Sequence, residues 1–511
     1  MKKRYFEFRK LSMLVLAGLT IVSCSDDDNG NGNGPVVDLP VTVAPDAAFT
    51  ALTNNNTIAY FNATNLVTPT STLSITALPA AEQIVSIDYR PATGQLYALG
   101  SSSRLYFINE ESGVATALGT AAFSPAISGE NASIDFNPTV DRIRLVTASG
   151  QNLRLHPELG TVVATDGEIN GGTNPEIGAV AYTNSVAGAS STTLYDIDFS
   201  ENKLYKQTPP NDGGLELVGD LTVDFEGSGN FDINPDNSLA FAVTLDGAVS
   251  SLYTIDLSNG KAIKVGTFGS SVMGIAFKTN PVAFATTADN QLYRFNPTSP
   301  ESNPVALMGL LSGETIVGLD FRPANGSLYA ISNQSRLLTV NTANGQVTQV
   351  GSVLSTPLNG TSFGFDFNPT VDRIRLVSNT GQNLRLHPDL GTVAFVDGTL
   401  NPGTPSVSGA AYSNSFAGST MTTLFVLDSE TNMLYTQTPP NDGVLVPVGA
   451  LGIDVVANNG FDIGGSSGSA FGLFKVGTAS SVYTVNLAAG TTTKVADFNI
   501  DATAMAVGLG F

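Results

Sequence analysis

The chain contains itself twice, and this duplication constrains its fold more than any other feature of the sequence. Residues 135–146 read DFNPTVDRIRLV, and residues 366–377, 231 positions further on, read the same. The segments GQNLRLHP and QTPPNDG also occur once in each half, at matching places. A repeat on this scale predicts two homologous structural units. We place them at residues 46–279 and 280–511.

A shorter period runs through both halves. Ten short apolar segments of one type, such as SIDYRP, SIDFNP and GLDFRP, recur at intervals of 44–51 residues. This spacing is close to the ~40–50 residues of one four-stranded propeller blade. Val, Ile, Tyr, Phe and Thr dominate the runs between turns, and no window shows a sustained apolar period of 3.6. The sequence therefore predicts an all-β protein, a β-propeller of about ten four-stranded blades in two homologous five-blade halves, with almost no helix.

The two ends of the repeat region indicate how the propeller closes. Residues 49–52 and 58–62 resemble second and third strands of a blade, whereas residues 506–511 resemble an inner strand with nothing after it. Pairing of these N- and C-terminal strands would complete one blade and leave no open edge. Residues 274–286 resemble an ordinary turn inside a blade, which favours a single ring of ten. Two five-bladed rings, each closed by its own last strand, are the alternative.

The N-terminus predicts export and lipid attachment. A basic segment, MKKRYFEFRK, precedes an apolar run at residues 11–22 that is too short to span a bilayer. The run ends in Ile-Val-Ser-Cys, which resembles the lipobox of bacterial lipoproteins. We predict a lipoprotein signal peptide over residues 1–23, and lipid attachment to the membrane through Cys24, the sole cysteine.

Residues 24–45 begin with an acidic cluster and continue as alternating Gly and Asn, a composition that predicts a flexible tether. The acidic cluster also resembles the signal that exports some Gram-negative lipoproteins to the outer face of the outer membrane. A plain solvated linker explains the same residues. We therefore predict an outer membrane lipoprotein that is exposed at the cell surface, with a periplasm-facing orientation as the alternative.

The charge of the remaining chain excludes one class of partner. Residues 1–23 hold five of the 23 Lys and Arg and one of the 44 Asp and Glu, which leaves 18 basic and 43 acidic residues. A body of this charge repels a phosphate backbone, so we expect no nucleic-acid partner.

An aspartate recurs at one position of the ten apolar segments. Alignment gives Asp, Asp, Ala, Asp, Ala in the first half and Asp, Asp, Ala, Asp, Gly in the second, with Gly510 as the tenth position. The six aspartates are Asp88, Asp135, Asp232, Asp320, Asp366 and Asp462. Around a central channel their oxygens could hold Ca²⁺. The interpretation that we favour is structural: each carboxylate bonds backbone N–H groups and fixes a strand end. On a wide ring, aspartates one blade apart would also be too distant to share an ion.

A second set of polar residues lies in the segments RIRLV and NLRLH. If the two segments form a hairpin that pairs Arg144 with Arg154, strand alternation places Ile and Leu on one face and polar side chains on the other. The polar face carries Arg142, Arg144, Asn152, Arg154 and His156, and in the second half Arg373, Arg375, Asn383, Arg385 and His387.

Two interpretations of this face remain open. His156 and His387 are the only histidines, and ten of the 11 arginines after residue 23 form matched pairs between the halves, whereas only two of the seven lysines, Lys264 and Lys494, do so. Such pairing indicates a need for the planar, bidentate guanidinium. The face could bind a carboxylate, a sulfate or an acidic sugar. The interpretation that we favour has the arginines bridging neighbouring blades, to acids such as Asp135, Asp141 and Glu158.

The segments LYAL and LYAI, together with DFNPTVDRIRLV…GQNLRLHP, carry a family resemblance. Over roughly residues 46 to 511, the chain resembles two copies of the bacterial family known as domain of unknown function 4394. The resemblance implies a propeller fold and brings no established activity.

The sequence has no nucleophile elbow, dinucleotide loop or zinc spacing of known type. We therefore predict a lipid-anchored binding module of the cell envelope, with an envelope protein or an extracellular polysaccharide as its partner. The alternative is an enzyme at the channel mouth, either a lactonase-like hydrolase or a polysaccharide-degrading enzyme, that uses a divalent cation held by aspartates. The sequence does not indicate the oligomeric state.

Overall fold

The computed structural model divides the chain at Val43, and Ala44–Phe511 form one compact unit. The structure describes residues 43–129, 131–226, 231–246, 249–457 and 459–511. The predicted signal peptide (1–23), Cys24 and all but the end of the predicted tether (24–45) lie outside the described residues.

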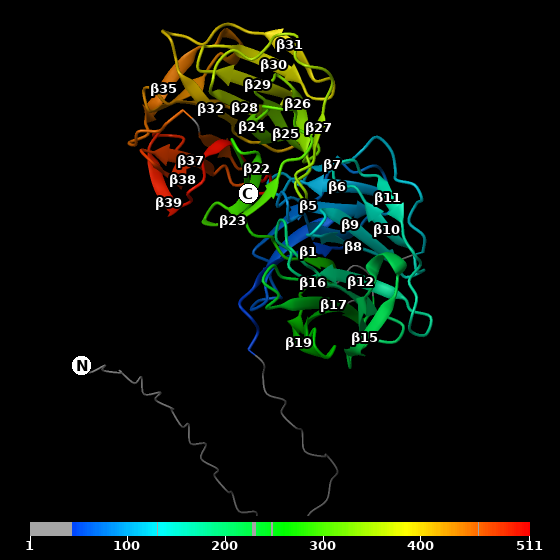
Figure 1. The fold of residues 1–511 in the computed structure, drawn as a ribbon. Helices are drawn as coiled ribbons and strands as arrows, with labels where there is room; N and C mark the ends of the chain where they lie inside the picture. The colour runs from blue at the N-terminus through cyan, green and yellow to red at the C-terminus, as the bar shows by residue number, and fades with distance from the viewer. Residues whose placement is uncertain (1–42, 130, 227–230, 247–248, 458) are drawn as a thin grey trace, which may run out of the picture. The chain divides into compact units, whose positions relative to one another are not determined.

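The described residues form ten antiparallel sheets of four strands each, which confirms the predicted all-β propeller (Figure 1). Among them, the only helical elements are two 3₁₀ turns, η1 (Pro210–Asp212) and η2 (Pro440–Asp442), both within the QTPPNDG segments. No helix in this part of the chain has the length and apolar character needed to cross a membrane.

Five sheets come from the first half. In chain order their strands are β1 (Ala48–Thr53), β2 (Thr57–Asn62), β3 (Ser71–Ser74), β4 (Ile84–Tyr89), β5 (Leu96–Gly100), β6 (Arg104–Ile108), β7 (Ala115–Ala117), β8 (Ala132–Asn137), β9 (Arg142–Thr147), β10 (Asn152–Leu155), β11 (Val162–Thr165), β12 (Ile177–Tyr182), β13 (Leu194–Asp198), β14 (Lys203–Gln207), β15 (Leu215–Asp220), β16 (Phe231–Ile233), β17 (Ala240–Asp246), β18 (Val249–Ile255), β19 (Ala262–Thr267) and β20 (Val272–Ala276).

The other five sheets come from the second half. Their strands are β21 (Ala283–Thr287), β22 (Gln291–Asn296), β23 (Ser299–Ala306), β24 (Ile316–Phe321), β25 (Leu328–Ser332), β26 (Leu337–Val340), β27 (Val347–Gln349), β28 (Phe363–Asn368), β29 (Arg373–Ser378), β30 (Asn383–His387), β31 (Thr392–Val396), β32 (Val407–Tyr412), β33 (Leu424–Asp428), β34 (Met433–Gln437), β35 (Leu445–Ala450), β36 (Gly460–Ile463), β37 (Ala470–Val476), β38 (Ala479–Val485), β39 (Thr492–Asp497) and β40 (Ala502–Val507).

The prediction that the N- and C-terminal strands pair with each other in a single ten-bladed ring was wrong. Strand β1 pairs with β20, with Thr50 opposite Ala276, and the C-terminal strand β40 pairs with β21, with Ala506 opposite Phe284. The inner strands β4, β8, β12, β16 and β20 contact one another in a circle, and β24, β28, β32, β36 and β40 form a second circle. The halves are therefore two five-bladed rings, the alternative above, which we call ring 1 and ring 2 (Figure 1).

The junction between the rings explains why the sequence favoured a single ring of ten blades. Residues 277–282 connect an inner strand to a second strand, as in any blade, so their sequence resembles an ordinary blade turn. Both β1 and β21 are second strands, and either could pair with the edge of β20. Which one pairs is decided by ring closure and not by the local sequence.

The apolar core lies between consecutive blades. In the second blade of ring 1, Arg144 pairs with Arg154, which confirms the expected hairpin register. Ile143, Leu145 and their partners on β10 then share one face, where they pack with Tyr97 and Phe136. Burying each such side chain stabilises the fold by ~1.5–3 kcal/mol.

Candidate functional site

The six predicted aspartates come together as two buried triads. Asp88, Asp135 and Asp232 each contribute a carboxylate oxygen that lies within 4.8 Å of the other two, and ring 2 repeats the arrangement with Asp320, Asp366 and Asp462. The concern that the aspartates would lie too far apart was therefore wrong, because a ring of five is narrower than a ring of ten.

Alanine occupies the other two inner positions of each ring. Ala276 pairs with Thr50, and Ala506 holds the matching place in ring 2 opposite Phe284. The expected tenth position, Gly510, was wrong, since it lies beyond the end of β40. With this correction the order Asp, Asp, Ala, Asp, Ala is the same in both rings.

Each carboxylate joins its own inner strand to the next one. Asp88 accepts one hydrogen bond from the N–H of Tyr89 at 2.7 Å and another from the N–H of Phe136, in the following blade, at 2.7 Å. Asp135 accepts from Tyr182 N–H at 3.0 Å. Ring 2 repeats these contacts between Asp320 and the strand that follows it. Loss of one carboxylate would therefore break backbone contacts between blades, because buried N–H groups need partners.

Burial and mutual repulsion control the charge of each triad. Burial raises the pKa of Asp232 and of Asp462 to about 7. Burial, together with the neighbouring carboxylates, raises the pKa of Asp88 and of Asp135 well above the usual range. Three carboxylates this close need shared protons or a bound cation. A span of 4.8 Å between oxygens suits Ca²⁺ at 2.3–2.6 Å from each ligand, so the triads are the residues that could hold it.

Arg144 and Arg154 converge on one acid, Asp166. Arg144 is buried and donates to Asp166 at 2.7 Å and to Asn152 at 2.7 Å, and Arg154 binds both oxygens of Asp166 at 2.7 and 2.9 Å. Arg144 also donates to Asn211, in the QTPPNDG segment of the next blade, at 2.8 Å. Arg144 thus forms a bridge between two blades, whereas Arg154 binds an acid of its own blade.

Ring 2 repeats the bridge residue by residue. Arg375 and Arg385 share Asp397, and Arg375 donates to Asn383 and Asn441. Asp166 and Asp397 were not predicted as partners of these arginines, for which the sequence suggested Asp135, Asp141 and Glu158. The signal was present, because an aspartate occupies the same place in TDG and VDG of the two halves.

Arg142 and His156 lie at the other end of the face. Arg142 donates to the backbone carbonyl of Asp141 at 2.8 Å, and no carboxylate of the described residues forms an ion pair with it. His156 accepts a hydrogen bond from Glu158 N–H through Nδ1 at 3.3 Å. Burial and the charges of Arg142 and Arg90 lower the pKa of His156 to about 4, so the ring is neutral at physiological pH.

In ring 2 the matching arginine makes the same contact, and the histidine differs. Arg373 donates to the backbone carbonyl of Asp372 at 2.8 Å. The Nδ1 atom of His387 is buried and has no hydrogen-bond partner within the described part of the chain.

A contact between the rings forms around Arg90, which is fully buried. Its guanidinium binds Asp141 and Glu158 and donates to the backbone carbonyl of Gly326, in ring 2, at 3.0 Å. Ser327 donates its hydroxyl to Glu158 at 2.9 Å. We call Arg90, Asp141 and Glu158 the ring 1 docking set, because together they bind a turn of ring 2.

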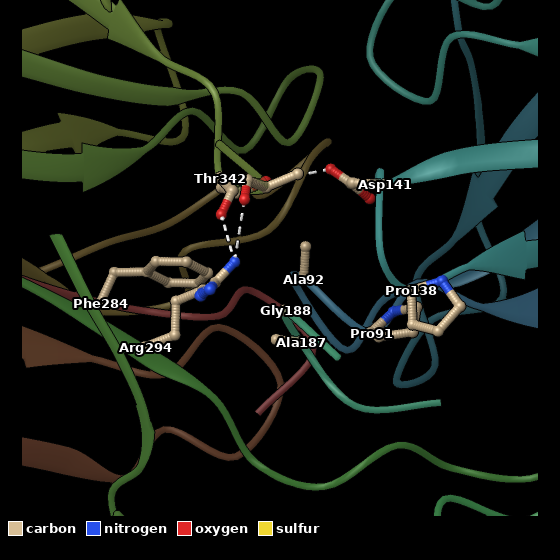
Figure 2. Close-up of a pocket in the computed structure, with 10 residues that line it drawn as sticks. Pro91, Ala92, Pro138, Asp141, Ala187, Gly188, Phe284, Arg294 and Thr342 are labelled. Carbon is tan, nitrogen blue, oxygen red and sulfur yellow. Dashed lines mark hydrogen bonds between the residues drawn. The ribbon is translucent and has the colours of Figure 1, made fainter. Parts of the chain in front are cut away.

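Thr342 and Arg294 extend this contact (Figure 2). Thr342 donates to Asp141 at 3.1 Å, and Arg294 donates to the carbonyls of Thr342 and Ala343 at 3.3 and 3.1 Å. Gly188 of ring 1, at φ 70°, lies so close to the Arg294 guanidinium that a Cβ atom there would be 2.1 Å from it. Arg294 is the one arginine after residue 23 without a counterpart in the other half, and this exception was the sequence signal for the contact.

Ring 2 carries a matching docking set that ring 1 does not cover. Arg322 binds Asp372 and Asp389 within its own ring. The side chains of Asp372 and Asp389 are 35% and 59% exposed, whereas those of Asp141 and Glu158 are 10% and 21% exposed. The carboxylates of Asp372 and Asp389 are therefore accessible, whereas Arg322 is buried at 8% exposure.

The solved structures that match the chain include two of low sequence identity. One, described as the structure of the Dos1 propeller, is 11% identical with a TM-score of 0.25 and covers 65% of this chain and 90% of its own. Another, PorZ, a surface component of the type-IX secretion system of Porphyromonas gingivalis, is 13% identical with a TM-score of 0.25 and covers 89% of this chain and 59% of its own. No curated protein matches the chain significantly.

A family match covers most of the sequence. The family described as "Domain of unknown function (DUF4394)" matches residues 57–276 and again residues 291–508, so that each match falls within one ring. The chain therefore belongs to this family of unknown function and contains two tandem copies of its domain.

Proposed function

We propose that this protein is a lipoprotein anchored through Cys24 in the outer membrane, and that its two rings form a binding module for another envelope protein. The signal-peptide pattern and the single cysteine support the anchor. The acidic residues after Cys24 support exposure at the cell surface, with a periplasm-facing orientation as the alternative. Changing Cys24→Ser should release the protein from the membrane fraction.

One observation carries the choice of a protein partner. The ring 1 docking set binds a polypeptide turn: Arg90 donates a hydrogen bond to the carbonyl of Gly326, and Glu158 accepts one from the hydroxyl of Ser327. The matching set in ring 2 has the same guanidinium and two carboxylates, and both carboxylates are accessible. A face that binds a turn in one copy is suited to bind a similar turn in the other.

The chemistry of the contact describes the expected partner. The bound turn supplies the carbonyl of Gly326 and the hydroxyl of Ser327, a second turn of ring 2 adds the hydroxyl of Thr342, and none of these atoms carries a charge. The ring 2 set therefore suits a turn with Gly and Ser or Thr at its tip. Cell-surface polysaccharide is the other partner class, and the experiment below separates the two.

The test uses a photocrosslinking amino acid in place of Leu390, which is 59% exposed and adjoins Asp389. The matched control places it at Leu159, which is 52% exposed and adjoins Glu158 of ring 1. In intact cells we expect a discrete, protease-sensitive product from position 390 that is absent from position 159. The variants Asp372→Asn and Asp389→Asn should reduce it.

Three results would reject the proposal: no product from position 390, the same product from both positions, or a product unaffected by the two Asn variants. A diffuse product that resists protease and yields to glycan cleavage would identify polysaccharide instead. The channel-mouth enzyme has less support, because the triad carboxylates that would hold its cation belong to aspartates that are 2–7% exposed.

A further inference from the structure

A small polar cavity lies between the two rings, on the side of Arg142 and His156. Its volume is about 230 Å³. Ring 1 contributes Arg142, His156 and the acids Asp141 and Glu158, and ring 2 contributes neutral polar side chains from β26, β27 and the turn between them. The cavity is smaller than the ~300–1,000 Å³ of a typical drug-sized site, and its wall is more polar.

The ring 1 wall presents the Arg142 guanidinium beside two acids, Asp141 and Glu158, and with Arg90 these four charges sum to zero. Asp141 and Glu158 both form ion pairs with Arg90. Arg142 donates one hydrogen bond to a backbone carbonyl and forms no ion pair with the described residues. His156 accepts through Nδ1, so its proton lies on Nε2, which can donate. The wall thus offers a guanidinium and an imidazole N–H to an anionic group.

The ring 2 wall offers amides that can both donate and accept. Asn341 uses its Oδ1 to accept from the N–H groups of Ala343 and Asn344, which leaves its Nδ2 as a donor. Gln346 uses its Nε2 to donate to two carbonyls, which leaves its Oε1 as an acceptor. Thr339 and Thr348 add hydroxyls to the same wall. Paired donors and acceptors of this kind match the hydroxyl groups of a sugar.

We propose that the cavity binds a small polyhydroxylated carboxylate, such as one uronic acid residue, with its carboxylate on Arg142 and His156 and its hydroxyls on the amides of ring 2. The volume admits one sugar ring. The proposal is independent of the protein partner above, because it involves neither the ring 2 docking set nor the anchor.

The duplication supplies a matched control. Arg373 and His387 occupy the positions of Arg142 and His156 in ring 2, and neither lines this cavity. The test is calorimetric titration of the whole chain after residue 23 with glucuronate, galacturonate and glucose. We expect a uronate to bind at least about tenfold more tightly than glucose, Arg142→Gln to weaken it at least about tenfold, and Arg373→Gln to leave it unchanged.

A second variant tests the opposite wall. Gln346 is exposed and lies in ring 2, so Gln346→Leu should fold normally, as circular dichroism can check, and should weaken uronate binding severalfold. The proposal is overturned if neither uronate binds, if glucose binds equally well, or if Arg142→Gln and Arg373→Gln have equal effects. The crosslinking result at position 390 does not depend on any of these outcomes, so the two proposals can fail separately.

Discussion

Ring 1 and ring 2 share their blade framework and differ where they meet. Both keep the aspartate triad and the arginine bridge, with the same bonds at nearly the same distances. At the contact the copies diverge: Tyr60 in ring 1 bonds Glu110, whereas Arg294 and Thr342 occupy those positions in ring 2. The comparison separates residues needed by every ring from residues needed to join two rings.

The largest effect should come from a feature that both rings keep, the aspartate triads. Their carboxyls hold protons in the folded protein at a pH at which the unfolded chain, with a pKa near 3.9, has released them. The folded state then binds more protons, so stability falls as pH rises from about 4 to about 7, the pKa of Asp232 and of Asp462. For Asp232 and for Asp462 the rise of the pKa from about 3.9 to about 7 corresponds to ~4 kcal/mol each, and the raised pKa values of Asp88 and Asp135 act in the same direction in ring 1.

Calorimetry from pH 4 to pH 8 measures this loss, and Asp232→Asn should flatten the profile for ring 1, as Asp462→Asn should for ring 2. The same scans with EDTA and with millimolar calcium test the cation. We expect the slope to persist in EDTA. A rise in melting temperature with calcium at pH 8, abolished by both Asn variants, would instead identify the triads as Ca²⁺ sites.

The next effect should differ between the rings. Arg90→Ala leaves Asp141 and Glu158, whose side chains are only 10% and 21% exposed, without their cation, which should cost about 3 kcal/mol. Arg322→Ala leaves Asp372 and Asp389 partly in water and should cost ~1 kcal/mol or less. Urea denaturation of both variants measures the difference, and equal losses would contradict the role of Arg90 at the contact.

These two cases show what the sequence could reveal. The 44–51-residue period predicted the blades, and the alternation in RIRLV and NLRLH predicted a hairpin register that Arg144 and Arg154 confirm. The aspartates were predicted from their recurrence at one position of the ten apolar segments. Their grouping in threes could not be predicted in the same way, because it depends on the ring size. Ring size depends in turn on whether β1 or β21 pairs with β20, and the two strands have similar sequences. Arg90 gave no local sign of its contact with Gly326, 236 residues away.

A smaller and equal effect is expected for the arginine bridge. Arg144→Lys and Arg375→Lys keep the charge and lose the planar fork that bonds an asparagine of the same blade, an aspartate and the QTPPNDG segment. Each should cost about 2 kcal/mol in thermal or urea unfolding. If both variants lose the same amount of stability and neither changes uronate binding, the bridge has a structural role. A loss of uronate binding in Arg144→Lys alone would place Arg144 in the cavity site.

The smallest effect should be a gain. Asp196 on β13 is fully buried, neither of its carboxylate oxygens has a hydrogen-bond partner within the described chain, and burial raises its pKa well above the usual range. Val426 occupies the matching position in ring 2 within an apolar cluster. Asp196→Val should therefore stabilise ring 1 by about 1 kcal/mol at pH 8, because the buried polar group is removed and Arg144 compensates its charge only in part.

The converse variant completes this comparison. Val426→Asp introduces the same buried carboxyl into ring 2 and should destabilise it by a similar amount at pH 8. Both effects should shrink toward pH 4, where the unfolded chain is protonated as well and the cost of neutralising the carboxyl disappears. If Asp196→Val loses stability at every pH, the carboxyl serves the blade through a contact that Val426 does not need, and the two rings differ in their cores as well as at their contact.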